Sequence, residues 1–220
     1  MIDAFSECEQ AVRTHDPDRF FAVLFAPEDK RPHLFALAAL YYEIAHAASA
    51  PREPMLKEIR LTWWRETIER ARAGKPRDHA VAQALTETLK VYDLPDALFE
   101  AMITARGTGF SDTAEAEAHA DATVGSLMRL MACVLGDEAD VRDAAVAYGL
   151  AGRRDGAFAD IDTDTLAKQH FARARRTRIP RALLPAVLPA ALVPLYLKRS
   201  YPPLWRKQIA YLGAALCGRI

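Results

Sequence analysis

Apolar residues recur at helical spacing along nearly the whole chain. Between about Met55 and Ala73 they step by 3, 4 and 3 positions: Leu61, Trp64, Ile68 and Ala71. This spacing places them on one face of a helix. No run of alternating apolar and polar residues is long enough to indicate a strand. The pattern therefore predicts an all-α protein.

Helix breakers and caps divide this pattern. Asp16 followed by Pro17 is typical of a helix start, and Gly74 with Pro76 is typical of a helix end. We expect helices over roughly 27–50, 55–73, 79–91, 95–108, 112–135, 138–154, 163–176, 180–199 and 203–217. No linker or low-complexity run interrupts them. The sequence predicts a single helical-bundle domain over 1–220 with a basic C-terminal part, 165–220.

Composition supports the helical interpretation. The chain has 42 alanines against 10 glycines, and alanine has the highest helix propensity. A content of 51% apolar residues suffices for a core and excludes a disordered chain. The three cysteines, Cys8, Cys133 and Cys217, form no CxxC pair, which favours reduced thiols. The acidic N-terminus has no apolar signal segment. We expect a cytoplasmic protein, with peripheral attachment to the inner membrane as an alternative.

Charge is distributed unevenly along the chain. Residues 165–220 hold eleven Lys or Arg and no Asp or Glu, so 1–164 hold 18 basic and 29 acidic residues. Three explanations remain open: a basic surface for anionic lipid or phosphate, a basic binding site, or a basic tail paired with the acidic remainder. The packing of a helical bundle favours the third, because it brings the two parts together.

Two C-terminal segments have apolar patterns that must be weighed against membrane insertion or membrane binding. The apolar stretch Ala182–Leu197 is interrupted by three prolines, which favours a kinked buried helix over a membrane-spanning one. Further on, apolar residues spaced by 4, 3 and 4 positions lie among basic residues: Trp205, Ile209, Leu212 and Leu216. This face would either close the core, which we favour, or rest on an anionic membrane surface.

Common catalytic and binding motifs are absent from the sequence. It contains no phosphate-binding loop, dinucleotide fingerprint, nucleophile elbow or zinc-ligand spacing. No two of the six histidines are four residues apart, which argues against a histidine metal site. No recognised nucleic-acid-binding module is present, so we expect no nucleic-acid partner.

Several strings carry a family resemblance: Leu34–Leu37, Glu43–Ala45, Glu58–Glu66 (EIRLTWWRE), His79–Leu85, Tyr92–Pro95, Asp121–Leu127 and Tyr148–Ala151. Together they resemble the squalene/phytoene synthase family, and most closely its branch containing the complex I assembly factors. The resemblance implies an isoprenoid-synthase fold, which is a helical bundle around a central cavity.

The resemblance also implies a test of activity. Active members of the family use Mg²⁺, held by one DxxxD pair on each of two facing helices, to remove diphosphate from a prenyl substrate. An ungapped match from Leu34 places the first pair at Ala45 and Ser49. A methyl group and a hydroxyl cannot replace two carboxylates, and Glu43 would point away from Ala45. We therefore expect no cofactor, or Mg²⁺ only if the protein is an enzyme.

The second pair falls on Asp160 and Asp164, which are the only candidate metal ligands. Glycines at 152 and 156 weaken a helix before them, so a solvated helix start is the simpler interpretation. Candidate substrate or cavity residues are Tyr41, Arg60, Trp63, Trp64 and Arg65. The arginines would meet diphosphate oxygens and the aromatic rings would line the cavity. The alternative, which we favour for Arg60 to Arg65, is core packing and salt bridges.

We expect a family member that has lost the Mg²⁺-dependent condensation and acts by binding. Its ligand would be a lipid or isoprenoid, or a partner protein in the assembly of a respiratory complex. The first rival is an active prenyltransferase that uses Asp160 and Asp164 on prenyl diphosphates. The second is a peripheral membrane protein whose basic C-terminal helix contacts an anionic membrane.

Overall fold

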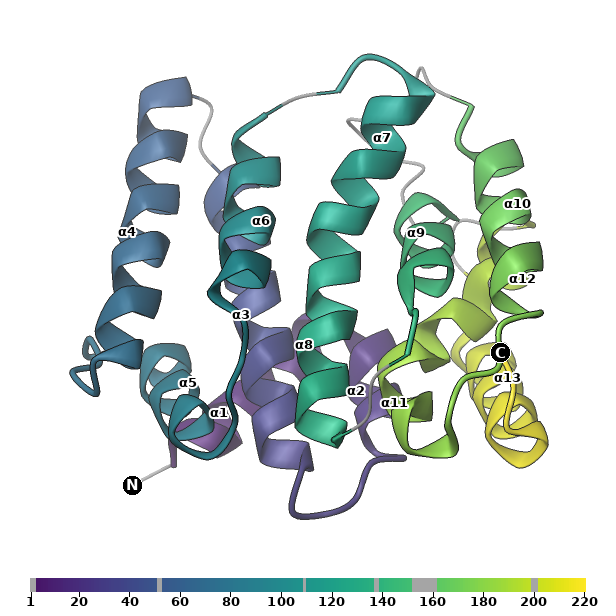
Figure 1. Ribbon diagram of the computed structural model, residues 1–220, viewed down its shortest axis with the longest axis horizontal. Helices are drawn as coiled ribbons and strands as arrows, with labels where there is room; N and C mark the ends of the chain where they lie inside the picture. Colours follow the sequence, from purple (N-terminus) through teal and green to yellow (C-terminus); the bar gives the residue numbers. More distant parts are fainter. Residues whose placement is uncertain (1–2, 51–52, 109, 137–138, 152–161, 199–201) are drawn as a thin grey trace.

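A computed structural model describes residues 3–50, 53–108, 110–136, 139–151, 162–198 and 202–220. Helices are the only regular secondary structure in these ranges, which confirms the all-α prediction (Figure 1). The α-helices are α1 (Ala4–His15), α2 (Pro17–Val23), α3 (Arg31–Ser49), α4 (Pro54–Arg72), α5 (Ala80–Val91), α6 (Asp96–Gly107), α7 (Thr113–Ala120), α8 (Ser126–Leu135), α9 (Arg142–Ala151), α10 (Asp164–Ala174), α11 (Leu184–Val187), α12 (Val193–Tyr196) and α13 (Leu204–Cys217). Between them lie a π-helical turn, η1 (Asp121–Gly125), and two 3₁₀ segments, η2 (Arg181–Leu183) and η3 (Leu188–Leu192).

Helix ends follow the local signals in the sequence. The Asp16 carboxylate accepts a hydrogen bond from the Arg19 amide at 3.1 Å, which caps α2 as predicted. Gly74 follows α4 with φ of 71°, a conformation that glycine adopts at little steric cost. The start of α3 differs from the prediction: this helix begins at Arg31 rather than residue 27. Residues 27–30 form a hydrogen-bonded turn instead.

The helix α3 lies at the centre of the bundle. It contacts α1, α2, α4, α5, α6 and α8, and every residue from 34 to 41 is buried. Leu34, Leu37, Leu40 and Ile44 have no exposed surface, so no water-sized space adjoins them. In Figure 1, α4 forms one edge of the bundle, whereas α10, α12 and α13 form the opposite edge.

The helix predicted over 112–135 contains a π-helical turn that the sequence pattern did not indicate. Asp121–Gly125 joins α7 to α8 without a break. A side-chain carbon at Gly125 would clash with Oδ1 of Asp121, so the Asp121 carboxylate would have to shift to admit one. A Cβ at Gly149 on α9 would lie 3.0 Å from the Cβ of Ala120, which shows how closely α9 approaches this turn. Such turns are frequent at functional sites.

The segment predicted as one kinked helix over 180–199 is instead a series of short turns. In the described residues up to 198, η2, α11, η3 and α12 follow one another, each spanning three to five residues. Pro185, Pro189 and Pro194 each stand in the first turn of one of them. Proline lacks the N–H that continues a helix, so each one starts a new turn. The segment is largely buried, as predicted. Among the described helices, none combines the length and apolar character needed to cross a bilayer.

The expectation that the apolar face of the last helix closes the core is wrong. Trp205, Ile209, Leu212 and Leu216 on α13 are 54–79% exposed. The buried residues of α13 are Tyr211 and Ala214. Polar anchors on the inner side of α13, described below, set this orientation.

Candidate functional site

Tyr41 lies in the middle of α3 and is 6% exposed. The guanidinium of Arg19, from α2, lies 4.4 Å from the centre of its ring, and that of Arg106, from α6, lies 4.6 Å from it. Both arginines are buried, and cations are attracted to the electron-rich faces of aromatic rings. Burial lowers the pKa of Arg19, but the charge of Asp16, its hydrogen bond, and the charges of Tyr41 and Tyr148 together raise that pKa more, so Arg19 stays charged. Two cations therefore pack against the Tyr41 ring inside the bundle.

A second buried cluster surrounds Asp18, one residue before Arg19. Its carboxylate accepts hydrogen bonds from the hydroxyl of Tyr148 on α9 at 3.1 Å and from the hydroxyl of Tyr196 on α12. The Lys207 ammonium on α13 donates to the same carboxylate at 2.8 Å. The Tyr211 hydroxyl donates to the Asp18 main-chain oxygen at 3.0 Å. Four contacts with the carboxylate or carbonyl of Asp18 thus fasten α9, α12 and α13 to α2.

Tyr196 on α12 and Tyr211 on α13 act as hydrogen-bond donors at any physiological pH. Burial raises the pKa of Tyr196 and Tyr211, and the negative charge of Asp18 raises both further. Sequence analysis missed this cluster. A polar residue in the first turn of a helix is ordinarily exposed, so Asp18 gave no signal of burial.

Three of the five candidate cavity residues do come together, but at the surface. Arg60, Trp63 and Trp64 on α4 line an open groove of about 260 Å³ with Glu43, His46, Ala47 and His79. The Trp63 and Trp64 rings meet edge to face, with centroids 4.9 Å apart. Trp64 is buried, Trp63 is partly buried and Arg60 is exposed.

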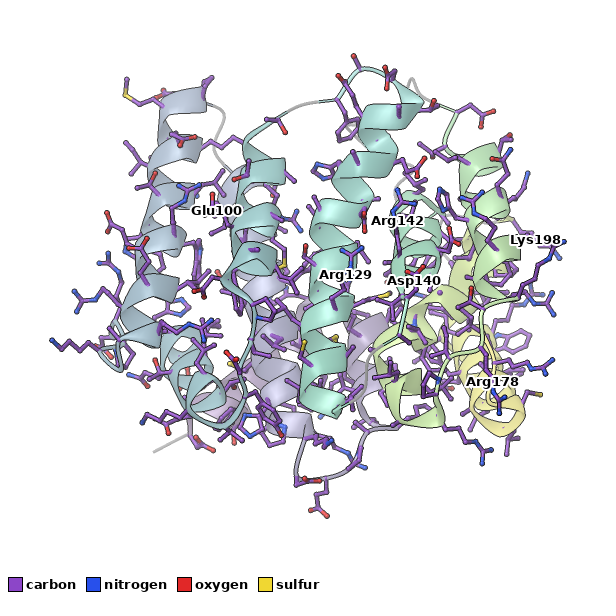
Figure 2. All side chains as sticks on the ribbon, in the orientation of Figure 1. Glu100, Arg129, Asp140, Arg142, Arg178 and Lys198 are labelled. Atoms are coloured by element: carbon purple, nitrogen blue, oxygen red, sulfur yellow. The ribbon has the colours of Figure 1, made fainter. Side chains whose placement is uncertain are left out.

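The other two candidates lie elsewhere. Tyr41 is in the buried arginine cluster described above. Arg65 forms two hydrogen bonds, of 2.9 and 2.8 Å, with the carboxylate of Glu100 on α6. Glu100 is labelled in Figure 2. The hydrogen bonds from Arg65 hold the pKa of Glu100 below its usual range. This bidentate pair joins α4 to α6, which is the salt-bridge alternative predicted for Arg65.

The described residues do not fit a magnesium cluster. Ala45 is partly buried and Ser49 is exposed, with its hydroxyl donating to the His46 carbonyl at 3.5 Å. Asp164 is the first residue of α10 and is partly buried, while Asp160 lies outside the described residues. Within the part of the chain that the structure describes, no three His, Cys, Asp or Glu side chains are arranged to hold a metal ion.

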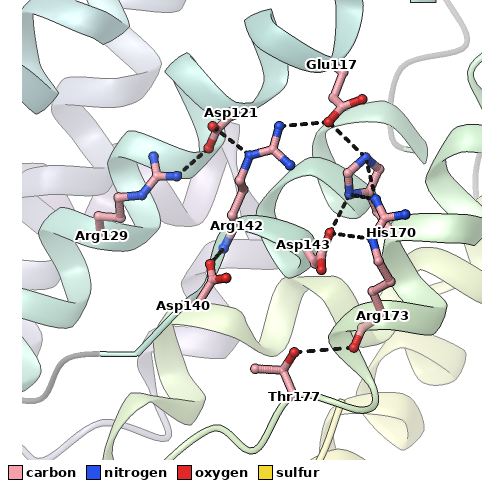
Figure 3. Close-up of polar contacts among 9 residues, drawn as sticks. All are labelled: Glu117, Asp121, Arg129, Asp140, Arg142, Asp143, His170, Arg173 and Thr177. Carbon is pink, nitrogen blue, oxygen red and sulfur yellow. Dashed lines mark hydrogen bonds and ion pairs between the residues drawn. The ribbon is translucent and has the colours of Figure 1, made fainter. Parts of the chain in front are cut away.

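Sequence analysis also missed a network of charges that joins α7, η1, α8, α9 and α10 (Figure 3). Arg142 contacts Asp121 at 3.0 Å and Glu117 at 2.7 Å, and Asp121 also accepts from Arg129 at 2.5 Å. Glu117 and Asp121 are four residues apart, so their shared helical face was readable from the sequence.

His170 on α10 is fully buried at the other end of this network. Its Nδ1 lies 2.6 Å from Asp143 and its Nε2 lies 3.3 Å from Glu117. Arg173 donates to Asp143 at 3.0 Å. Burial raises the pKa of Asp143 and Glu117, but hydrogen bonds from His170, Arg173 and Arg142 lower those pKa values more. Each acid in this network contacts at least one basic side chain from another helix, which is typical of a network that holds helices together.

The comparisons with known proteins agree with this fold. A crystal structure of a dehydrosqualene synthase with a bound ligand superimposes with a TM-score of 0.76 over 97% of this chain and 96% of that one, at 13% identity. Squalene synthase HpnC from Alicyclobacillus acidocaldarius gives a TM-score of 0.68 over 98% of this chain and 94% of that one, at 17% identity. At these identities the likeness shows an isoprenoid-synthase fold, as the resemblance implied.

Sequence relatives include NADH dehydrogenase (ubiquinone) complex I assembly factor 6 from Homo sapiens, 26% identical over 134 residues, and from Bos taurus, 25% identical over 134 residues. Each match covers 59% of this chain and 40% of the relative, so the chain matches about two fifths of the length of these proteins. The family model described as squalene/phytoene synthase matches residues 12–192. The chain therefore belongs to the squalene/phytoene synthase family.

Proposed function

We propose that this chain is a family member without Mg²⁺-dependent condensation and that it acts by binding a partner protein. One observation carries the proposal: Ala45 and Ser49 stand on α3 where the family's first aspartate pair is expected. Magnesium needs several oxygen ligands in near-octahedral geometry. A methyl group supplies none, and the Ser49 hydroxyl offers one neutral oxygen in place of a carboxylate. No resident cofactor is part of this proposal.

The packing around α3 supports a protein partner over a lipid held inside the bundle. A prenyl chain needs an apolar cavity of its own length. Instead, Leu34, Leu37 and Leu40 are completely covered by neighbouring helices, and Arg19 and Arg106 enclose Tyr41. A long apolar ligand in this part of the interior would have to displace packed side chains or strip charged groups of their contacts.

The sequence relatives suggest which partner to test. The matched proteins are named as assembly factors of complex I, so we propose a role in the assembly of a respiratory complex. The partner would be a protein component of that complex.

Absence of catalysis is tested with the purified full chain, Mg²⁺, and farnesyl or geranylgeranyl diphosphate. We expect no squalene, no phytoene and no released diphosphate, while an active squalene synthase run in parallel gives product. Turnover above background would overturn the proposal. In that case Asp160→Asn with Asp164→Asn identifies the prenyltransferase rival, because both carboxylates would then be needed.

The assembly role is tested by deleting the gene in its own host. We expect fully assembled NADH dehydrogenase, and its ubiquinone-dependent activity, to fall and to recover when the parent chain is restored. The Asp160→Asn, Asp164→Asn variant should restore both equally well, because the proposed role uses no metal. Normal amounts of assembled enzyme in the deletion strain would contradict the role.

A further inference from the structure

The outermost helix, α13, has its more apolar face turned outward. Four residues form what we call the α13 stripe: Trp205, Ile209, Leu212 and Leu216. Their exposed fractions are 56, 61, 54 and 79%. Contiguous exposed apolar surface on this scale marks an interaction site, because single exposed residues are common but aligned ones are not.

Polar contacts on the inner side fix this orientation. Lys207 and Tyr211 on α13 both bond to Asp18, and Lys207 also donates to the Tyr196 hydroxyl at 2.8 Å. Rotating the helix to bury the α13 stripe would break these contacts and leave Asp18 buried without its cation. The helix is therefore held with its apolar side toward the surroundings.

The apolar surface extends beyond α13. Phe21, Leu24 and Phe25, at the end of α2, line a groove of about 330 Å³ with Tyr211 and Leu212. Leu24 and Phe25 are 39 and 40% exposed. The end of α2 with the residues after it, and α13, thus contribute to one apolar area.

A cleft rich in arginine begins where the α13 stripe ends. It measures about 810 Å³ and lies between the end of α10 and the end of α13. Five arginines line it, and we call it the arginine cleft: Arg175, Arg176, Arg178, Arg181 and Arg219. Across the described residues, no ion pair engages any of these five. Arg181 donates to the carbonyl of Leu216 at 3.5 Å, which ties the cleft to the α13 stripe.

We propose that the α13 stripe and the arginine cleft together form a docking surface for a membrane containing anionic phospholipid. The apolar side chains enter the boundary between headgroups and acyl chains, and the guanidinium groups bind lipid phosphates in the paired geometry that arginine favours. Trp205 suits this boundary, and the Arg206 guanidinium lies 5.1 Å from its ring. Arg178 and Lys198 lie along the same edge of the molecule (Figure 2).

Charge complementarity selects anionic lipid as the occupant. Within the described part of 165–220 there are ten basic residues and no acidic one, and eight of the ten form no ion pair, so these segments attract a negative surface. A partner that was merely apolar would explain the α13 stripe but not the cleft, and a free phosphate would explain the cleft but not the stripe. This inference is independent of the proposed function, because it does not concern the interior of the bundle.

The test is sedimentation of the full chain with vesicles of phosphatidylcholine, with and without 30 mol% phosphatidylglycerol (an amount on the order of that in anionic membranes). We expect binding only with the anionic lipid, and weaker binding as salt is raised. Arg175→Gln with Arg178→Gln should weaken it about thirtyfold. Ile209→Ser with Leu212→Ser should weaken it at least about tenfold.

Matched controls come from the opposite edge of the bundle. Arg70→Gln with Lys75→Gln removes two exposed charges there, and Met55→Ser with Ile59→Ser removes two exposed apolar side chains of α4. Both controls should bind like the parent. In addition, lipids brominated in the acyl chain should quench the fluorescence of Trp205, a signal that Trp205→Phe removes.

Three outcomes would overturn the proposal. They are no binding to anionic vesicles, equal binding by parent and docking-surface variants, and binding of inorganic phosphate to the cleft without any binding of vesicles. Circular dichroism of each variant checks that it is folded, and loss of binding by a folded variant supports the proposal. Failure here would leave the absence of catalysis and the assembly role untouched, since those are measured by product formation and by complex amounts.

Discussion

The arginines of the charge network and those of the arginine cleft are close in the chain but have opposite surroundings. Arg173, in the last turn of α10, bonds to Asp143 and contacts His170. Arg175 and Arg176, only two and three residues later, line the arginine cleft and form no ion pair within the described residues. The first group holds helices together, whereas the second faces outward.

All three arginines are exposed, so their positions relative to an acid explain the difference. Arg173 is 49% exposed and its Nε reaches the carboxylate of Asp143, whereas Arg175 and Arg176 form no ion pair with any described acid. An exposed guanidinium keeps its hydration and can exchange it for a ligand. Of the ten described cations in 165–220, only Arg173 and Lys207 form ion pairs. The expectation that the basic tail pairs with the acidic remainder therefore applies to these two alone. The other cations remain available to an external anion.

The largest effect is expected from Asp18→Ala, in the buried cluster that pairs Lys207, the other paired cation of 165–220. The substitution leaves Lys207 without its acid and the hydroxyls of Tyr148 and Tyr196 without their acceptor, while Tyr211 keeps the main-chain oxygen. We expect the free energy of unfolding to fall by about 3–5 kcal/mol, measured by urea denaturation. Asp93→Ala removes an exposed aspartate and should change it by less than about 0.5 kcal/mol. A loss at Asp18 no larger than that of the control would mean that the cluster does not hold α13.

An intermediate effect on stability is expected when the pH is lowered. Because hydrogen bonds lower the folded-state pKa of Asp143 and Glu117 below ordinary values of 3.8 and 4.5, their stabilising contribution is complete at neutral pH. This stabilising contribution is lost as the pH falls below 4.5 and then through the lowered folded-state pKa values of the two acids. The melting temperature should therefore drop more steeply between about pH 5 and pH 3 in the parent than in Asp143→Asn. Equal slopes in the two proteins would contradict the role given to this network.

The smallest effect on stability is expected from the arginine cleft. Arg175→Gln with Arg178→Gln removes exposed charges that have no ion-pair partner among the described residues. The free energy of unfolding should stay within about 0.5 kcal/mol of the parent value in urea denaturation, even though the same variant loses membrane binding under our proposal. A loss above about 1 kcal/mol would show that these arginines have a structural role instead.

Local patterns predicted much of the helical content because they depend on neighbouring residues. Asp16 and Gly74 mark helix ends by their own hydrogen bonding and backbone freedom. The π-helical turn at Asp121–Gly125 had no such local signal, and the contacts of Asp121 there are with Arg129 and Arg142, eight and twenty-one residues away. The groove residues Arg60, Trp63 and Trp64 share one helix, so the sequence could group them but could not tell surface from interior.

The sequence by itself indicated the all-helical fold and the family, and it led us to expect Ala45 and Ser49 at the place of the family's first carboxylate pair, since each rests on residue type and spacing. Only the tertiary structure decided which face of α13 is buried. Its apolar periodicity fits either orientation equally well. Asp18, almost two hundred residues away in the chain, settles the choice by binding Lys207 and Tyr211, and a contact between such distant residues leaves no periodic trace in either segment.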